Sequence, residues 1–329
     1  MAFIDSSKAG NGVEMLVPFG KREFTHIIHD IDGTHSLIRD WPPVMSLSMH
    51  YAMTSGLEEG FDSKENLEKL VARVGSEPLP ETDRTCVEFG GYSALTQLEY
   101  GIRRGFQEGT YNKKLEKYMT PEVLETNAKI LDLMRSGVEI FDDIEEPAEI
   151  KTYIKEIGPP LFRLYEDILN GACRDKNTEE ARTNPEKWRV PGSVEFMEHL
   201  KSLGCTNYFV TGAVVYEEGG MLEEVEACGF KVGHGELVES LRGSTWDKKM
   251  PKDDWIKAII KEEGLDPKQV LIVGDGRTEI KVGVEMGSVT ISRLPKDEIL
   301  QRKIQTDLGT NIIITDYKVE GLLEMFTEK

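Results

Sequence analysis

The chain has 329 residues, 39% of them hydrophobic, and a formal net charge of -19 at pH 7. This length predicts about two domains, and the acidic charge argues against nucleic acid or an anionic membrane as a partner, because clustered cations bind both. A small phosphorylated metabolite remains compatible with the charge, since screening leaves the local charges of a cleft to decide what binds there.

The first residues and the cysteines predict a cytoplasmic protein without disulfides or a zinc site. The start MAFIDSSKAG has neither the basic region nor the apolar core of a signal peptide, and the apolar runs are shorter than the ~18 residues of a membrane span. The four cysteines form no CxxC pair, and the six histidines show no HxxxH or HExxH spacing.

The first informative segment is EFTHIIHDIDGT, in which an apolar strand candidate at residues 26–29 is followed by Asp30 and Asp32. The chain then turns away through Gly33 and Thr34, so both carboxylates are expected to face an open crevice. Two such acids suit phosphate chemistry, because one carboxylate can attack phosphorus while the other handles protons.

Two other interpretations of this segment fit the sequence less well. A hairpin would need an alternating return strand, but SLIRDWPPVMSLSMHYAM has the spacing and the proline of a helix start. A calcium loop would place a ligand and the required glycine on Thr34 and His35. A purely structural role for Asp30 and Asp32 stays open at this point.

Residues 42–186 read as an all-helical domain inserted after the first strand, and residues 1–41 and 187–329 form the core. We expect the insertion to cover the site as a lid or cap. Its amphipathic helical patterns are PPVMSLSMHYAM, KENLEKLVARVG, SALTQLEYGIRRGFQ, PEVLETNAKILDLMRSG and AEIKTYIKEIG.

The core alternates strand and helix patterns, which predicts an α/β fold with a parallel sheet covered by helices. The further strand candidates are residues 207–210, 270–273, 288–291 and 312–315, with a possible edge strand at VEMLV. The helical patterns between them are SVEFMEHLKSLG, EEGGMLEEVEACGF, DDWIKAIIKEEG and EIKVGVEMG.

Two of these strands carry polar groups where they are expected to end. Thr211 and Gly212 in NYFVTG offer a hydroxyl and a backbone N–H to a phosphate oxygen, and Asp275 and Glu279 in QVLIVGDGRTEI bring two more acids to the crevice. Gathered carboxylates repel one another unless a cation offsets them, and oxygen ligands beside a phosphate favour Mg2+. Each segment alone is also a common turn or helix start.

A phosphate site also needs a cation, for which WDKKMPKDDWIKAII offers Lys248, Lys249 and Lys252. Pro251 suits the first position of a helix, so Lys252 lies in the first turn, at the edge where strands end. We therefore choose Lys252, with the other two as alternatives; a solvated basic run would also explain all three.

At this stage four motifs together resemble those of the haloacid dehalogenase superfamily of phosphohydrolases. HDIDGT resembles its first motif, FVTG its second, Lys252 its third and GDGRTEI its fourth, in the family's order. The resemblance covers about residues 21–41 and 187–329. It implies a Rossmann-like three-layer α/β/α core, and the helical insertion occupies the place of the cap called C1.

The resemblance also implies roles for individual residues. Asp30 would be the nucleophile that forms an aspartyl phosphate, and Asp32 would protonate the leaving oxygen and later deprotonate water. The remaining implied contacts are phosphate binding by Thr211, Gly212 and Lys252, and Mg2+ binding by Asp30, the Asp32 carbonyl, Asp275 and Glu279. His35 departs from the pattern, since an apolar residue is usual there, and Glu279 stands where aspartate is frequent.

These features predict a Mg2+-dependent phosphomonoesterase acting on a small phosphorylated metabolite. A phosphomutase of the β-phosphoglucomutase kind needs the same motifs, and a protein-binding module with a vestigial core is a third possibility. Asp32 favours phosphate esters, because dehalogenases and phosphonatases are similar only in the first aspartate. The substrate contacts suggested in the insertion and just before it are Arg39, Arg103 and Arg104.

Overall fold

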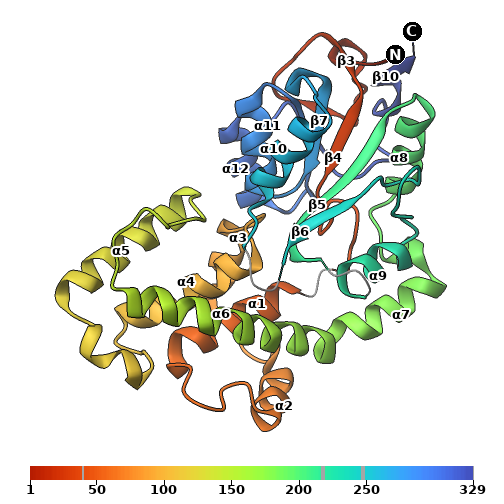
Figure 1. Ribbon diagram of the computed structural model, residues 1–329. Coiled ribbons are helices and arrows are strands. Elements are labelled where there is room, and N and C mark those ends of the chain that lie inside the picture. The colour runs from red at the N-terminus through yellow and green to blue at the C-terminus, as the bar shows by residue number, and fades with distance from the viewer. Residues whose placement is uncertain (39–40, 216–218, 246–248, 329) are drawn as a thin grey trace. The chain divides into compact units, whose positions relative to one another are not determined.

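The computed structural model describes residues 1–38, 41–215, 219–245 and 249–328, and it divides the chain into two compact units (Figure 1). The first unit comprises Met1–Arg39, Lys176–Thr245 and Met250–Lys329. The second unit comprises Asp40–Asp175 and Trp246–Lys249. We call them the core unit and the helical unit.

The core unit is built on a seven-stranded sheet with the strand order β2-β9-β8-β7-β4-β5-β6. Neighbouring strands are parallel except for the edge pair of β2 and β9. In this order the strands are Glu14–Met15, Ile312–Ile314, Val289–Arg293, Val270–Gly274, His26–His29, Thr206–Val214 and Leu241–Ser244. The strands predicted from the sequence are therefore present, and β4 lies in the middle of the sheet.

Alternate residues of each strand face opposite sides of this sheet, and helices cover both sides. Ile27 packs in the cluster that contains α8 (Ser193–Ser202) and α9 (Gly220–Ala227), whereas Ile28 packs in the cluster that contains α10 (Lys252–Glu262) and α11 (Arg277–Met286). Figure 1 shows α8 on one side of the sheet and α10, α11 and α12 (Ile299–Leu308) on the other. The core unit is thus a three-layer α/β/α structure, as predicted.

A second, three-stranded sheet in the core unit was not predicted from the sequence. Its strand order is β10-β1-β3, and β1 (Ala2–Asp5) pairs antiparallel with both β10 (Phe326–Glu328) and β3 (Lys21–Phe24). The pairing of β1 with β10 joins residues more than 300 positions apart, and such a pairing leaves no local pattern in the sequence.

Helices make up the helical unit, and every strand of the described residues lies in the core unit. The helices are α1 (Trp41–Ser55), α2 (Lys64–Arg73), α3 (Pro80–Glu88), α4 (Ala94–Gln107), α5 (Pro121–Ser136) and α6 (Ala148–Leu169), with a short 3-10 helix at Lys113–Tyr118 and a π-helical segment at Asn170–Arg174. At the centre α4 buries Leu98, Ile102 and Phe106, a four-residue spacing that turns one face inward.

The structure differs from the sequence prediction at the end of the insertion. The helical pattern AEIKTYIKEIG, which ends at Gly158, is part of a longer helix that continues through Pro159 and Pro160 to Leu169, and α7 (Asp175–Thr183) follows the π-helical segment. Whereas the sequence places the boundary at residue 187, the structure begins the second part of the core unit at Lys176. Ala181 explains the difference, because it is fully buried in the core unit's hydrophobic cluster.

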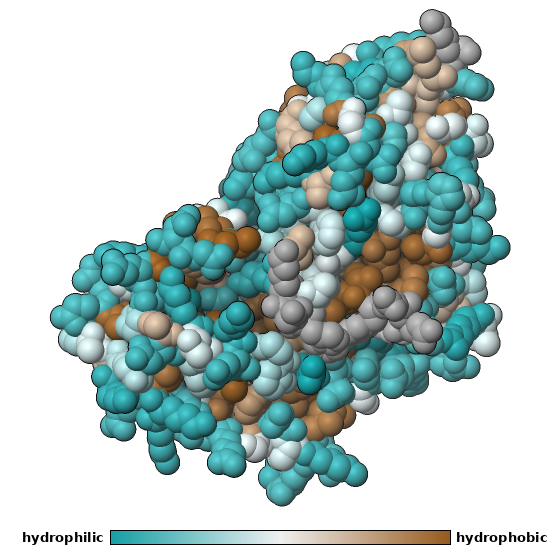
Figure 2. Space-filling view, in the orientation of Figure 1, coloured by the Kyte–Doolittle hydropathy of each residue, from teal (hydrophilic) through white to brown (hydrophobic). Residues whose placement is uncertain are grey.

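Charged and polar residues dominate the visible surface, in agreement with the composition (Figure 2). Among the described residues, no helix combines the length and the apolar character that crossing a bilayer would require.

Gly101 allows α4 to approach α1 closely and gives the first test. A Cβ at this position would lie 2.7 Å from the Met49 carbonyl oxygen. Helix propensity alone predicts that Gly101→Ala stabilises the protein by roughly 0.5 to 1 kcal/mol. The close contact predicts the opposite sign, a loss of about 1 to 3 kcal/mol in the free energy of unfolding, measured by urea titration. Glu125→Ala on the exposed face of α5 is the control and should change stability by less than about 0.5 kcal/mol.

Candidate active site

The candidate site lies at the carboxyl ends of β4 and β7, two parallel neighbours in the middle of the sheet. Asp30 directly follows β4, and its backbone N–H donates to the Val273 carbonyl of β7 at 2.8 Å. Asp275 directly follows β7. Because parallel neighbours end at the same edge of the sheet, the two aspartates meet there.

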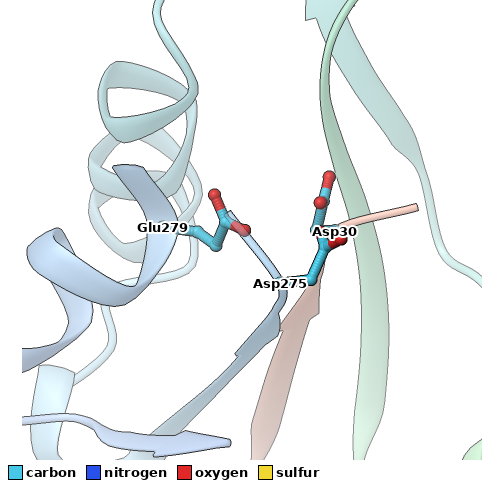
Figure 3. Close-up of side chains that lie close together, drawn as sticks. All are labelled: Asp30, Asp275 and Glu279. Carbon is cyan, nitrogen blue, oxygen red and sulfur yellow. The ribbon is translucent and has the colours of Figure 1, made fainter. Parts of the chain in front are cut away.

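Three carboxylates converge at this edge. Oxygen atoms of Asp30, Asp275 and Glu279 all lie within 4.8 Å of one another. Figure 3 shows the two aspartates at the strand ends and Glu279 reaching toward them from α11. Asp30 is 6% exposed and Glu279 only 1% exposed, so water screens their mutual repulsion poorly.

Lys252 offsets part of this negative charge. Its Nζ donates to Asp30 Oδ1 at 2.8 Å and to Glu279 Oε2 at 3.2 Å, and the side chain is almost fully buried. Burial by itself lowers the pKa of an ammonium group, but the facing carboxylates outweigh burial and raise the pKa of Lys252 above its usual value. Burial also raises the pKa of Glu279, although Lys252 opposes that rise. Lys252 is therefore a permanent cation in this cluster.

The donor set fits a magnesium ion. Three carboxylates face one ammonium group, so the cluster keeps an excess of negative charge that a divalent cation would balance. Carboxylate oxygens are among the ligands that Mg2+ prefers. Asp30, Asp275 and Glu279 would supply them.

The turn that carries Asp275 is closed tightly around Glu279. Glu279 Oε1 accepts a hydrogen bond from the Gly276 backbone N–H at 2.6 Å, at the start of α11. A Cβ on Gly274 would lie 2.3 Å from the same oxygen. The first glycine of GDGRTEI therefore makes room for the acid, which explains this part of the motif in steric terms.

Two glutamines that the sequence analysis missed hold the outer side of this turn. Gln301 and Gln305 donate their amide N–H groups to the Asp275 carbonyl at 2.7 and 2.8 Å, and Gln305 also donates to the Gly276 carbonyl at 2.8 Å. Both lie on α12, whose helical pattern the sequence analysis did not identify. Two amides four residues apart give no signal in a sequence, because only the packing of α12 brings them to the turn.

The turn after β4 is held in a similar way. Gly33 has a φ of 76°, in the left-handed region that favours glycine, and its carbonyl accepts from Arg293 Nη1 at 2.8 Å. The Thr34 hydroxyl donates to Asp275 Oδ1 at 3.4 Å, which links this turn to the one after β7. Asp32 lies in the same turn and is half-buried.

Thr211 is buried, but the strand does not end there as the sequence analysis expected. On one side, β4 ends at His29. On the other side, β5 still pairs with β6 as far as Val214, so the strand continues to that residue. Its pairing with β6 is interrupted between Val210 and Val214, so Thr211 and Gly212 lie in an irregular stretch of strand. The Thr211 Oγ1 accepts from the Ala213 N–H at 3.1 Å. The register against β4 places Val210 level with Asp30, so Thr211 is near the same edge.

The arginines suggested as substrate contacts have other partners. The buried Arg103 pairs with Glu99 and Glu146, each at 2.8 Å, inside the helical unit. A buried guanidinium must be neutralised, so this pairing accounts for Arg103 without a substrate. Arg104 pairs with Glu81 and Glu108. Arg39 lies outside the described residues.

The alternative lysines differ from Lys252 in position. Lys249 belongs to the helical unit, where its Nζ donates to Glu99 Oε2 at 2.7 Å and to the Glu139 carbonyl at 3.1 Å. Lys248 lies outside the described residues. Of the lysines that the structure describes in this segment, Lys252 is the one beside Asp30.

No protein-family model matches the chain, and no curated protein matches it in sequence. Among solved structures it is similar to a β-phosphoglucomutase from Clostridium difficile, with a TM-score of 0.45, 10% identity, and coverage of 92% of this chain and 96% of that one. It is also similar to a HAD family hydrolase from Deinococcus radiodurans R1 with bound phosphate and sodium (TM-score 0.45, 12% identity, coverage 94% and 100%).

A third similar structure is a predicted phosphoglycolate phosphatase from Haemophilus somnus 129pt, with a TM-score of 0.44, 14% identity, and coverage of 89% of this chain and 95% of that one. Because these TM-scores are below 0.5, the function proposed below rests on the residues of the site.

Removing the buried cation tests the electrostatics of the site. Lys252→Met keeps the length of the side chain but leaves Asp30 and Glu279 without their partner, so the free energy of unfolding at pH 7 should fall by about 3 to 5 kcal/mol. The loss should shrink as the pH is lowered, because Glu279, whose pKa is already raised, then takes up a proton in the folded state and no longer needs the cation. Urea titrations in EDTA at pH 7 and at lower pH measure both effects.

Lys257→Met on the same helix is the matched control. Lys257 is about half exposed and pairs with Asp253 at the surface, so its loss should cost less than about 1 kcal/mol. Equal losses for the two variants would contradict the role given to Lys252.

Proposed function

We propose that this protein is a Mg2+-dependent phosphomonoesterase that works through an aspartyl phosphate on Asp30. The observation that carries the proposal is the position of Asp30 at the end of the central strand, where a buried ammonium group bonds it and two further carboxylates lie within 4.8 Å. A phosphoryl group is stabilised by a fixed cation and by a metal ion, and this cluster offers the first and the ligands for the second. The four sequence motifs support the same chemistry.

The proposed reaction has two displacements at phosphorus. An oxygen of Asp30 attacks phosphorus, the bond to the ester oxygen breaks, and Asp32 gives its proton to that leaving oxygen. Water then attacks the phosphorus of the aspartyl phosphate, Asp32 takes the water's proton, and inorganic phosphate leaves the regenerated Asp30 carboxylate. Asp32 has the exposure this role requires, since it is half-buried beside a nucleophile that is almost fully buried.

The remaining residues of the site would orient the phosphoryl group. Lys252 would pair with its oxygens while staying in contact with Asp30, and Thr211 and the Gly212 N–H would bind from the neighbouring strand. Bound Mg2+ would supply charge neutralisation between the Asp30 carboxylate and the phosphoryl oxygens. The substrate is then a small phosphorylated metabolite.

A phosphomutase remains the second candidate, because it uses the same residues and differs in keeping water away from the aspartyl phosphate. Product analysis with a hexose phosphate separates the two: released phosphate supports the hydrolase, and an isomerised sugar phosphate overturns it in favour of the mutase. Absence of activity on a panel of sugar, nucleotide and amino acid phosphates would favour a binding module instead.

Asp30→Asn tests the nucleophile. The amide cannot form the aspartyl phosphate, so turnover of an aryl phosphate with Mg2+ should fall by at least about 1,000-fold, measured as phosphate release. Asp307→Asn, the same change at an exposed position of α12, should keep the wild-type rate. Activity that persists in Asp30→Asn would remove Asp30 as the nucleophile.

Binding of Mg2+ should stabilise the fold, because the ion relieves the repulsion among the three carboxylates. At a concentration of about 100 times its Kd, Mg2+ should add about 2.7 kcal/mol to the free energy of unfolding, seen as a rise in Tm. The rise should be absent in Asp275→Asn, which loses a proposed ligand. An equal rise in both proteins would show that Mg2+ binds elsewhere.

A further inference from the structure

The residue that departs from the sequence motif, His35, forms a hydrogen-bonded pair with His29 beneath the site. The two histidines bracket the segment that holds both aspartates, since His29 precedes Asp30 and His35 follows Thr34. Both side chains are fully buried, and His35 Nε2 lies 2.9 Å from His29 Nδ1. The pair therefore connects the end of β4 directly to the exit of the catalytic turn.

Asn207 on β5 determines which nitrogen of His29 carries the proton. Its Nδ2 donates to the carbonyls of Met197 and Leu237, each at 3.2 Å, so its Oδ1 must face His29 Nε2 at 3.0 Å. The flipped amide would set its oxygen against both carbonyl oxygens. His29 consequently donates from Nε2 to Asn207 and accepts at Nδ1.

The tautomer of His29 also fixes which group donates in the hydrogen bond between His29 and His35. Since His29 Nδ1 is an acceptor, His35 Nε2 must carry the proton and donate it. Both imidazoles are fully buried, and burial disfavours the charged form of a ring. The chain of donors runs from His35 through His29 to Asn207.

The surroundings of His35 show what the imidazole contributes. Its ring stacks on Tyr317, with centroids 4.9 Å apart and planes 10° apart, and packs against Phe209 and Phe230. Its Nδ1 is buried and has no hydrogen-bond partner, which costs free energy. An apolar ring would fill this aromatic environment without that cost. The gain from histidine here is its Nε2–H, which lies 2.9 Å from His29 Nδ1 and 3.2 Å from the Tyr317 hydroxyl oxygen.

We propose that His35 is a positioning residue whose hydrogen bond to His29 fixes the turn carrying Asp30 and Asp32 in the geometry that the reaction needs. The turn's own backbone bonds, from the N–H groups of His35 and Ser36 to the Ile31 carbonyl at 2.8 and 3.0 Å, close it locally but do not tie it to β4. The imidazole pair supplies that connection. This inference rests on the proposed function.

The test compares His35→Phe with His35→Gln. Phenylalanine keeps the aromatic packing and removes the donor, so kcat for an aryl phosphate should fall by about tenfold to a hundredfold while KM changes by less than about twofold. Glutamine keeps a hydrogen-bond donor, so His35→Gln should lose less kcat than His35→Phe. The decrease in log kcat should be smaller by at least about a third. His26→Phe, at the far end of β4, is the matched control and should keep the wild-type kcat.

Nitrogen-15 spectra of the imidazoles give a readout that does not depend on activity. Wild-type His29 and His35 should both appear as neutral Nε2–H tautomers, and in His35→Phe the Nδ1 signal of His29 should move to the position of a nitrogen without a hydrogen bond. An Nδ1–H tautomer at His29, or an unchanged kcat in His35→Phe, would overturn the inference.

Two further measurements keep the test decisive. If His35→Phe does not fold, His35→Met, which also fills the space without a donor, takes its place. If the wild type hydrolyses no phosphate ester, the proposed function fails, and the affinity for Mg2+, measured by calorimetry, then tests whether His35 positions the turn. Weaker Mg2+ binding in His35→Phe (or His35→Met) than in His35→Gln supports the positioning role. Equal binding in these variants overturns it.

Discussion

The site depends on one electrostatic constraint, the gathering of acidic side chains from separate segments in a place where water screens them poorly. Asp30 and Glu279 are almost fully buried, and Asp275 is close to both. Such a cluster is stable only with cations, and the fold supplies one by placing Lys252 in the first turn of α10, between Asp30 and Glu279. The remaining negative charge is what suits the three carboxylates to the divalent metal ion proposed above.

A second constraint is that the turns carrying these acids must not move. Their polar backbone groups are bound by buried side chains: Gln305 binds the carbonyls after β7, Arg293 binds the Gly33 carbonyl, and Glu279 binds the Gly276 N–H. The hydrogen bond between His35 and His29 connects the exit of the first turn to the end of β4. Each contact satisfies a buried polar group and fixes a carboxylate at the same time, so stability and geometry come from the same bonds.

Much of the core could be predicted because its pattern is local. Each central strand is a short apolar run, and the residue after β4 or β7 is an acid, so the convergence of Asp30 and Asp275 follows from the rule that parallel strands end at one edge. The end of β5 could not be predicted, because β6 extends it past Thr211. The full length of α6 was not identified either, because the helix continues past Gly158 through Pro159 and Pro160 to Leu169.

By itself the sequence determined the parallel strands of the central sheet, the helical character of the insertion and which acids and lysine follow strand ends or begin a helix, because these depend on periodicity and on residues adjacent to strand ends. Only the tertiary structure decided that Arg103 is neutralised within the helical unit, that Gln301 and Gln305 hold the Asp275 turn, and that His35 bonds to His29. The reason is physical. A hydrogen bond or ion pair between distant segments depends on which elements pack together, and a helix or strand pattern does not encode that packing.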